Sequence, residues 1–184
     1  MALRPTYEIR IGGEKAAEVR KKLFTPFREK FTIDVPGPDD LEMKGDLLDH
    51  EYVIERGGVE VAAVLGQEPD KVFKTLVTQG KSKNYYVFMV PVAEELDLKK
   101  AAKAVGEKSI EMIKSKDLLP LTGYVHGGCS PIGMKKFFPT TIHETAPLYD
   151  TIFFSGGRIG FQIELPFTDL EKVIRVECAD IIKE

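Results

Sequence analysis

The sequence lacks long apolar runs, and this absence excludes a membrane-spanning helix. No run approaches the roughly 20 apolar residues that such a helix requires. The N-terminus also lacks the continuous apolar stretch of a secretory signal, so we expect a cytoplasmic protein. Apolar residues nevertheless make up 43% of the 184 residues, which is enough for a folded core and argues against disorder. We expect one domain, or one domain with an appendage.

Cysteine is also scarce. Cys129 and Cys178 form no Cys-x-x-Cys pair, which argues against a disulfide framework and against a cysteine-rich zinc site. We expect Cys178 to be a small core residue. His126 and His143 leave open a cysteine–histidine nucleophile with Cys129, or a zinc site, although no fourth metal ligand is apparent.

Positive charge is concentrated in the middle of the chain. The net charge of −3 argues against a surface that attracts nucleic acid everywhere. Residues 71–136, however, carry 12 lysines against 6 acidic side chains, a net of +6. This third of the chain could hold a phosphate backbone locally, although a solvated lysine face is the simpler interpretation on charge alone.

Period-two alternation of apolar residues predicts a β-meander over the first 58 residues. The alternating segments are Tyr7–Ile11, Phe31–Val35, Leu41–Met43 and Tyr52–Ile54, with Ala17–Val19 as a further partner. Residues 59–65 fit either a helix or a continuing strand, because Val61, Val64 and Leu65 have helical spacing while Val59, Val61 and Ala63 alternate.

Strands and helices are mixed in the remaining sequence. Buried strands are expected at 73–77 and 85–90, and a hairpin at 151–165. Helices are expected after Asp97, after Ser115 and before Pro120, and at the capping box Thr168–Glu171. The fold class is α/β, with a mixed or barrel-like sheet and surrounding helices.

Five ordered motifs resemble those of one family. They are Val72–Val77, Pro91–Lys100, Leu121–Tyr124, Gly127–Gly133 and Ser155–Gly160. In this order and spacing they resemble the YbaK family of free-standing aminoacyl-tRNA deacylases, whose fold also occurs as an editing domain in prolyl-tRNA synthetase. The resemblance covers residues 59–184 and implies a deacylase domain there.

The resemblance implies a substrate and a mechanism. The substrate would be tRNA(Pro) wrongly carrying cysteine, and prolyl-tRNA synthetase would be a loose partner. The thiol of the substrate would attack its own ester carbonyl, so no metal or cofactor is needed. The protein would supply positioning, exclusion of water and stabilisation of the oxyanion.

The resemblance also assigns site residues. Catalytic roles fall on Lys74, Gly127 and Ser155: an ammonium for phosphate or ribose, a backbone amide and a hydroxyl. Substrate-binding roles fall on Thr75, Gly128, Ser130, Gly156, Gly157 and Gln162. Gln162 stands where the best-known members have an aspartate, and an amide can hydrogen-bond a ribose hydroxyl but cannot act as a carboxylate base.

The front of the chain departs from the family. Residues 4–58 resemble part of a LURP-one-related domain, through Tyr7–Ile9, Ala17–Phe24, Lys30–Ile33 and Lys44–Tyr52. Residues 1–58 and 59–184 would then be two fragments joined in a chimera. Because this fragment has too few strands for a barrel, its edge should pair with the main sheet or with a second copy in a homodimer. His50–Ile54 is a candidate for the missing family strand.

Two other functions stay open. The foreign front end could leave a folded chimera that has no enzymatic activity, or residues 1–58 could bind protein or phospholipid as a β-sheet module. A Cys129 nucleophile is disfavoured further because the family accepts ordinary apolar residues at that position.

Overall fold

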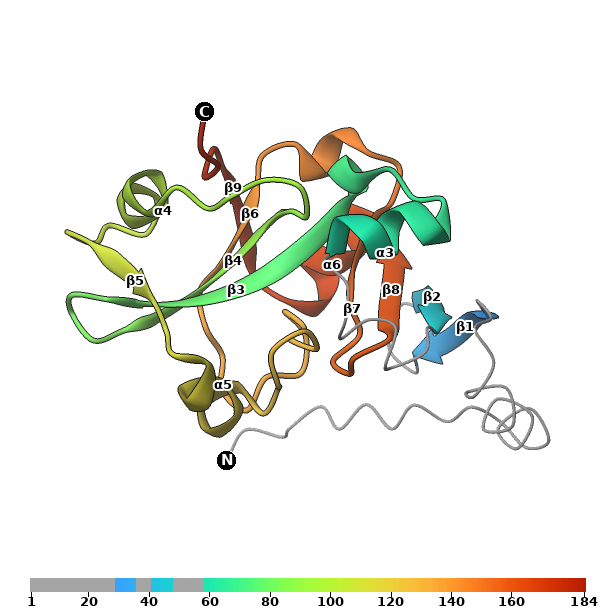
Figure 1. Cartoon of the computed structure of the whole chain (residues 1–184), viewed down its shortest axis with the longest axis horizontal. Coiled ribbons are helices and arrows are strands. Elements are labelled where there is room, and N and C mark those ends of the chain that lie inside the picture. Colours follow the sequence, from blue (N-terminus) through green and yellow to red (C-terminus); the bar gives the residue numbers. More distant parts are fainter. Residues whose placement is uncertain (1–28, 36–40, 48–57) are drawn as a thin grey trace.

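A mixed β-sheet forms the centre of the molecule (Figure 1). The computed structural model describes residues 29–35, 41–47 and 58–184, and within these the sheet has nine strands. Eight strands follow the order β1-β2-β8-β7-β3-β4-β6-β9, and β5 pairs with β3. The strands are β1 Glu29–Val35, β2 Leu41–Leu47, β3 Val72–Gly80, β4 Tyr85–Pro91, β5 Ile110–Met112, β6 Thr140–His143, β7 Ile152–Ser155, β8 Phe161–Leu165 and β9 Val176–Ala179. This arrangement confirms the expected α/β class with a mixed sheet.

The long hairpin β3–β4 is the spine of the sheet. Its seven antiparallel pairs run from Phe73 opposite Pro91 to Gln79 opposite Tyr85. Nearly all of β4 is buried, because parallel β6 covers its other edge and packed side chains cover both of its faces. Strand β4 is therefore the continuous apolar run that the sequence predicts.

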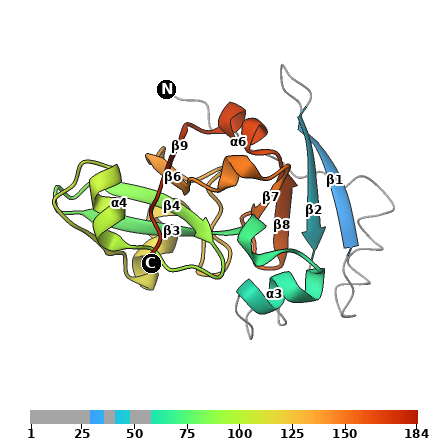
Figure 2. The same ribbon diagram turned by 90° about the horizontal axis from the view of Figure 1, so that it is seen from above.

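Among the described residues, four α-helices and two short 3-10 helices lie around the sheet, and Figures 1 and 2 show their arrangement. They are α3 Gly58–Leu65, α4 Leu98–Ala104, α5 Ser115–Thr122, α6 Phe167–Val173, and the 3-10 helices Pro69–Lys71 and Ala146–Leu148. Helix α4 begins as predicted, because the Asp97 carboxylate accepts hydrogen bonds from the backbone N–H groups of Lys99 (2.7 Å) and Lys100 (2.9 Å). The segment that could be helix or strand is helix α3.

Two predicted helix boundaries are wrong. Helix α6 has Pro166 at its N-cap, with no side-chain capping bond, so Thr168–Glu171 is not a capping box. The helix starts earlier because Phe167, which is 8% exposed, enters the core at its first position. Helix α5 does not stop before Pro120 but runs through it to Thr122, and it ends where Gly123 adopts a left-handed φ of 90°.

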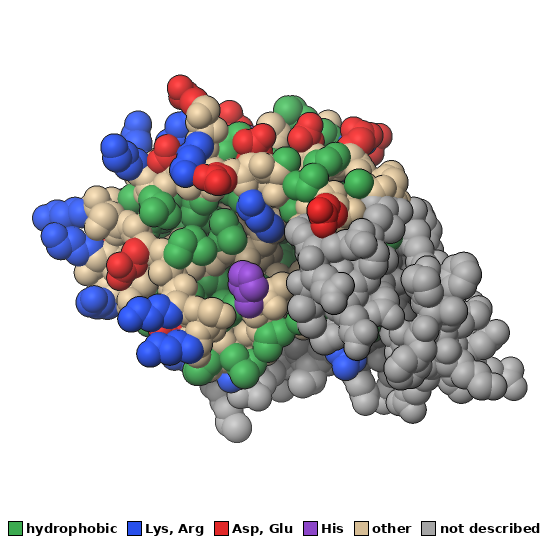
Figure 3. Space-filling view, in the orientation of Figure 1, with side chains coloured by type: hydrophobic (Ala, Val, Ile, Leu, Met, Phe, Trp, Pro, Cys, Tyr) green, Lys and Arg blue, Asp and Glu red, His purple; other side chains and the backbone are tan. Residues whose placement is uncertain are grey.

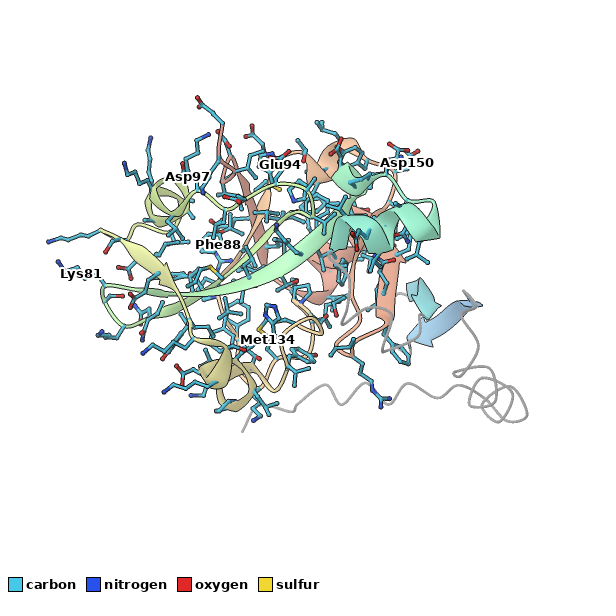
Figure 4. The ribbon with its side chains drawn as sticks, viewed as in Figure 1. Lys81, Phe88, Glu94, Asp97, Met134 and Asp150 are labelled. Atoms are coloured by element: carbon cyan, nitrogen blue, oxygen red, sulfur yellow. The ribbon has the colours of Figure 1, made fainter. Side chains whose placement is uncertain are left out.

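The core consists of three apolar clusters. One lies between β3, β7, β8 and α6 and includes Phe73, Phe154 and Ile163. A second lies under α4 on the opposite face of the β3–β4 hairpin and includes Phe88 and Val90 (Figure 4). The third lies between the β3–β4 hairpin, which contributes Val77, and the loop that follows α5, which contributes Cys129.

The prediction for Cys178 is wrong, because this residue is exposed on β9. Strand β9 pairs only with β6 in the described sheet, so one of its edges lies at the rim. The residues on either side, Glu177 and Ala179, are respectively exposed and partly exposed. A short apolar run at a sheet edge is therefore not a core strand.

Hairpin β1–β2 extends the sheet beyond β8 (Figure 2). Its seven pairs join Glu29–Val35 to Leu41–Leu47, and four further pairs join β2 to β8. The alternations predicted at Phe31–Val35 and Leu41–Met43 therefore lie in strands. Those predicted at Tyr7–Ile11, Ala17–Val19 and Tyr52–Ile54, and the candidate strand His50–Ile54, lie outside the described residues. Division of the chain into two domains near residue 58 stays a prediction.

Candidate functional site

Two parallel strands, β3 and β7, separate beside Lys74, Thr75 and Ser155. Strands β3 and β7 pair at only two positions, Val72 with Phe153 and Phe73 with Phe154. Beyond these pairs β3 continues along β4, while β7 turns back into β8. Where the strands part, this edge of β3 has no strand partner among the described residues until β5 joins it at Thr78, and polar groups at such an edge are available to a ligand. Lys74 and Thr75 follow directly on β3, and Ser155 follows on β7.

One face of the sheet at this point carries three polar side chains from adjacent strands. Side chains alternate between the faces of a strand, and Phe73, Phe154 and Ile163 point into one core cluster. Lys74 and Ser155 therefore lie on the opposite face. Gln162 shares that face, because it is the cross-strand partner of Ser155.

The other face is covered by the glycine-rich loop 127–133. Cys129 packs with Val77 and Val87, and Ile132 packs with Phe73 and Met89. Thr75 lies between these positions as the cross-strand partner of Met89. Its hydroxyl oxygen is buried and has no hydrogen-bond partner in the described part of the chain. A buried hydroxyl without a partner is unfavourable, so it marks a position where a ligand or a water could be bound.

The two glycine-rich turns contact each other. A Cβ placed on Gly128 would lie 3.0 Å from the backbone nitrogen of Ile159 and 3.2 Å from the carbonyl carbon of Arg158. Gly157, with a φ of 94°, lies against the ring of Tyr124, whose hydroxyl donates to the carbonyl of Ile132 at 2.5 Å. Only residues without a side chain allow this approach, so both turns need their glycines for packing.

The predicted hydroxyl and amide donors are partly used within these turns. The backbone N–H of Gly128 donates to the carbonyl of Val125 at 3.1 Å. Ser130 is 1% exposed, and its Oγ accepts from the N–H of Ile132 at 3.3 Å. Ser155 Oγ accepts from the N–H of Gly157 at the same distance. Gly127, with a φ of 81°, has no acceptor for its N–H among the described residues, so its amide is one that a ligand could engage.

Lys74 has a partly desolvated ammonium group. Its Nζ donates to the carbonyl of Val92 at 3.2 Å, in the loop after β4. Burial lowers the pKa of Lys74 from its ordinary value, and the nearby carboxylates of Glu95 and Glu94 oppose this shift. Figure 4 shows Glu94 and Asp97 on the loop after β4. A charge held in this way is weakly solvated, and it therefore gains more from an incoming anion than a surface lysine does.

Cys129 is unsuited to nucleophilic chemistry. Its side chain is 8% exposed, and burial raises the pKa of the thiol to about 12. Only the thiolate is an effective nucleophile, and at neutral pH this thiol remains protonated. In the described residues no group of three His, Cys, Asp or Glu side chains is arranged to hold a metal ion.

One residue of this site carries no signal in the sequence. Gln67, just after α3, is 8% exposed, and its Nε2 donates to Oε1 of Gln162 at 2.6 Å. The two residues lie 95 positions apart in the chain. A glutamine that follows a helix usually faces solvent, so only the fold reveals this pair.

Comparison with known proteins identifies relatives for most of the chain. Residues 57–173 match the family described as "Aminoacyl-tRNA editing domain". A protein of Enterococcus faecalis named "Putative Cys-tRNA(Pro)/Cys-tRNA(Cys) deacylase EbsC" is 54% identical over 105 residues, which are 57% of this chain. The matched part is 64% of that relative's length, so the chain spans less than two thirds of it.

Two crystal structures share the fold. One, titled "Crystal structure of a putative trans-editing enzyme for prolyl tRNA synthetase", has a TM-score of 0.66 at 22% identity and covers 94% of this chain and 99% of its own. The other, of "hypothetical protein APE2540", has a TM-score of 0.65 at 19% identity and covers 92% of this chain and all of its own. At these identities the likeness concerns the fold alone.

Proposed function

The chain belongs to the aminoacyl-tRNA editing domain family, and from this membership we propose that it hydrolyses the ester of cysteine wrongly attached to tRNA(Pro). The relative that is 54% identical carries the name of a deacylase for Cys-tRNA(Pro) and Cys-tRNA(Cys), which supports both the reaction class and the amino acid. The observation that carries the proposal is the contact between the two glycine-rich turns beside the point where β3 and β7 part, with Lys74 and Ser155 on one face of the sheet there and Thr75 and the loop 127–133 on the other.

The chemistry proposed at this site is an attack by the substrate on itself. The cysteinyl thiol adds to its own ester carbonyl, a carbon–sulfur bond forms, and the carbon–oxygen bond to the ribose breaks. The thiol proton ends on the ribose hydroxyl that leaves, and the product is a thiolactone that water opens later. The protein contributes orientation and a stabilised oxyanion, since the nucleophile comes with the substrate.

Each residue has a definite part in the proposal. The N–H of Gly127 donates to the oxyanion, because that amide has no acceptor among the described residues. Lys74 leaves the carbonyl of Val92 and binds the terminal phosphate or ribose. Ser155 and Gln162 bind the adenosine or the aminoacyl group from the neighbouring strands. Thr75, Gly128, Ser130, Gly156 and Gly157 form the walls of the site, and the buried Thr75 hydroxyl gains its missing partner from the ligand.

A lysine-rich end of the molecule supports a tRNA partner. In Figure 3 basic side chains gather at the left end of the visible face, and Figure 4 shows Lys81 extending from the tip of the β3–β4 hairpin. Exposed lysines in this region are Lys81, Lys83, Lys108, Lys114 and Lys116. We call these five residues the lysine end. It would hold the phosphate backbone while the acceptor end reaches the site.

The test is ester loss from cysteinyl-tRNA(Pro) and alanyl-tRNA(Pro), each incubated with the protein and with Lys74→Ala. The proposal expects cysteine-selective loss that Lys74→Ala reduces by at least about tenfold, as removal of one charge-assisted hydrogen bond should do. Lys99→Ala, an exposed lysine on α4, is the matched control. A wild type with no activity would instead favour the inactive chimera, and equal rates for Lys74→Ala and wild type would remove Lys74 from the site.

Three further statements belong to the same proposal. A loose complex with prolyl-tRNA synthetase would bring the substrate, and the protein would act in the cytoplasm, where tRNA is charged. The outer edge of hairpin β1–β2 remains a candidate for pairing with a second copy. No helix among the described residues has the length and apolar character needed to cross a bilayer.

A further inference from the structure

The end of helix α3 places a polar side chain where an apolar one is usual. Gly66 has a φ of 66°, its N–H donates to Ala63, and the N–H of Gln67 donates to Ala62 at 2.9 Å. This pair of bonds is a Schellman motif, in which the residue after the glycine usually makes an apolar contact with the last turn of the helix. Here that residue is Gln67, and it is buried. A buried amide at this position needs partners elsewhere in the fold.

One of those partners is a residue of the candidate site. Gln67 Nε2 donates to Oε1 of Gln162 at 2.6 Å, across 95 positions of sequence. Helix α3 lies beside the β7–β8 hairpin in both ribbon views, so this bond connects the helix end to the strand face that carries Ser155 and Gln162 (Figures 1 and 2). The residue that follows helix α3 thereby holds the Gln162 side chain of strand β8 in one orientation.

The bond also determines which end of the Gln162 carboxamide stays available to a ligand. A carboxamide has one accepting oxygen and one donating nitrogen, and here the oxygen is engaged by Gln67. No described residue accepts from Nε2 of Gln162. The end of this side chain that remains for a ligand is therefore a donor. Together with the Lys74 ammonium, it makes the face complementary to oxygen acceptors, such as phosphate, carbonyl and ribose oxygens.

We propose that Gln67 is a positioning residue, which holds the Gln162 carboxamide so that its NH₂ group donates to an oxygen atom of the substrate. This inference rests on the proposed function, and it adds a specificity determinant to it. Substrates must present an acceptor at this point, and a group that can only donate would meet an unfavourable N–H to N–H contact. Gln67 acts through Gln162 and does not touch the substrate itself.

Deacylation kinetics of single and double variants test the proposal. Gln67→Leu suits the Schellman motif, so the fold should be retained while the hydrogen bond is removed. We expect Gln67→Leu and Gln162→Ala each to lower kcat/KM by about tenfold, the effect of one oriented hydrogen bond. Gln67→Leu in the Gln162→Ala background should cause no further loss, because Gln67 acts only through Gln162. Gln79→Leu, a substitution on β3 outside the site, is the control for replacing a glutamine.

The outcomes are distinct. If Gln67→Leu lowers kcat/KM by the same factor with and without Gln162, its role is structural and the proposal is overturned. A second measurement does not depend on activity: the ¹⁵N side-chain amide resonances of Gln162 should shift in Gln67→Leu and stay in place in Gln79→Leu. A wild type without deacylase activity would refute the proposed function alone. Unchanged Gln162 amide resonances in Gln67→Leu would overturn the positioning role whatever the activity.

Discussion

The backbone of Gly128 lies directly against the backbone of Ile159, with only 3.0 Å between the Ile159 nitrogen and the point where a Cβ of Gly128 would be. The loop after α5 and the β7–β8 turn are thus held together by main-chain packing. Neither partner can move aside as a flexible side chain could, because both belong to the backbone. This packing determines how close Gly127 stands to the end of β7.

Gly128→Ala should therefore be costly for both stability and activity. We expect a loss of about 1–3 kcal/mol in the free energy of unfolding, the usual cost of forcing an extra methyl group into a packed site. Deacylation should fall as well, because the two turns would be pushed apart. Thermal and urea unfolding measure the first effect, and ester loss measures the second.

Gly106→Ala is the matched control for that substitution. Gly106 has a φ of 72°, and nothing lies within 4 Å of the Cβ position, so alanine there adds only backbone strain. This strain should cost about 1–2 kcal/mol and leave the activity of the folded protein unchanged. If Gly128→Ala proves as active as Gly106→Ala, close approach of the turns is not required for catalysis.

Replacing Lys74 should make the protein less active but more stable near neutral pH. Burial lowers the pKa of Lys74 in the folded state, so folding a charged Lys74 is unfavourable below that pKa. The unfavourable contribution is present at neutral pH and fades as pH rises through the folded-state pKa toward the ordinary value of 10.5. Lys74→Met removes it, so its advantage over wild type in thermal unfolding should shrink at alkaline pH.

Lys99→Met is the control for the Lys74 experiment, since Lys99 is exposed on α4. It should change neither the midpoint of unfolding nor its pH dependence. Should Lys74→Met be less stable than wild type at neutral pH, the bond to Val92 and the carboxylates of Glu94 and Glu95 outweigh the cost of burial.

The two cysteines should differ sharply in reactivity. Cys178 is exposed and should react slowly with a maleimide at neutral pH, because partial burial and the carboxylates of Glu171 and Glu144 raise the pKa of its thiol; the buried Cys129, with a pKa of about 12, should not react. Cys129→Ala should retain kcat/KM within about twofold, because a protonated buried thiol takes no part in the reaction. Mass spectrometry of the labelled protein locates the modified cysteine. Loss of activity in a folded Cys129→Ala would restore the thiol-enzyme hypothesis.

The lysine end should dominate the salt dependence of tRNA binding. Replacing Lys81, Lys83 and Lys108 with alanine should weaken binding and make the plot of log K against log salt less steep, by about 0.7–0.9 for each phosphate that the protein no longer neutralises. Filter binding over a series of salt concentrations gives the slope. Lys172 and Arg175 are exposed near α6, and alanine at both positions should leave the slope unchanged.

Local patterns in the sequence predict much of the fold. Strands β3 and β4 were predictable because each carries an apolar run, and the β7–β8 hairpin because its strands flank the Ser155–Gly157 turn signal. Helix α4 was predictable because Asp97 caps it through its own neighbours. Strands β5, β6 and β9 were not, since they have only three or four residues and are defined by their partners in the sheet. A short segment such as Thr140–His143 has no period of its own.

The site shows the same division. Motifs predict Lys74, Gly127, Gly128 and Ser155 as site residues, because a lysine at a strand start and glycine-rich turns have recognisable neighbours. Gln67 could not, because its partner Gln162 lies 95 positions away and neither position has a local reason to be buried. The use of Ser130 and Ser155 oxygens inside their own turns was equally hidden, since a serine beside glycine fits a ligand site and a turn alike.

The two-residue pairing of β3 with β7 has a consequence for how the protein tolerates change at its front. In the described sheet, strands β1, β2, β8 and β7 pair with the other half only at Val72–Phe153 and Phe73–Phe154, and the remaining contact between the halves is side-chain and turn packing. With only two paired positions between the halves, the hydrogen-bond register of the long hairpin is set by β4 and not by the sequence of the first strands. Evolution or a protein engineer could therefore exchange the leading segment while the remaining half keeps its register, and the exchange would act first on β8, the strand that pairs with β2.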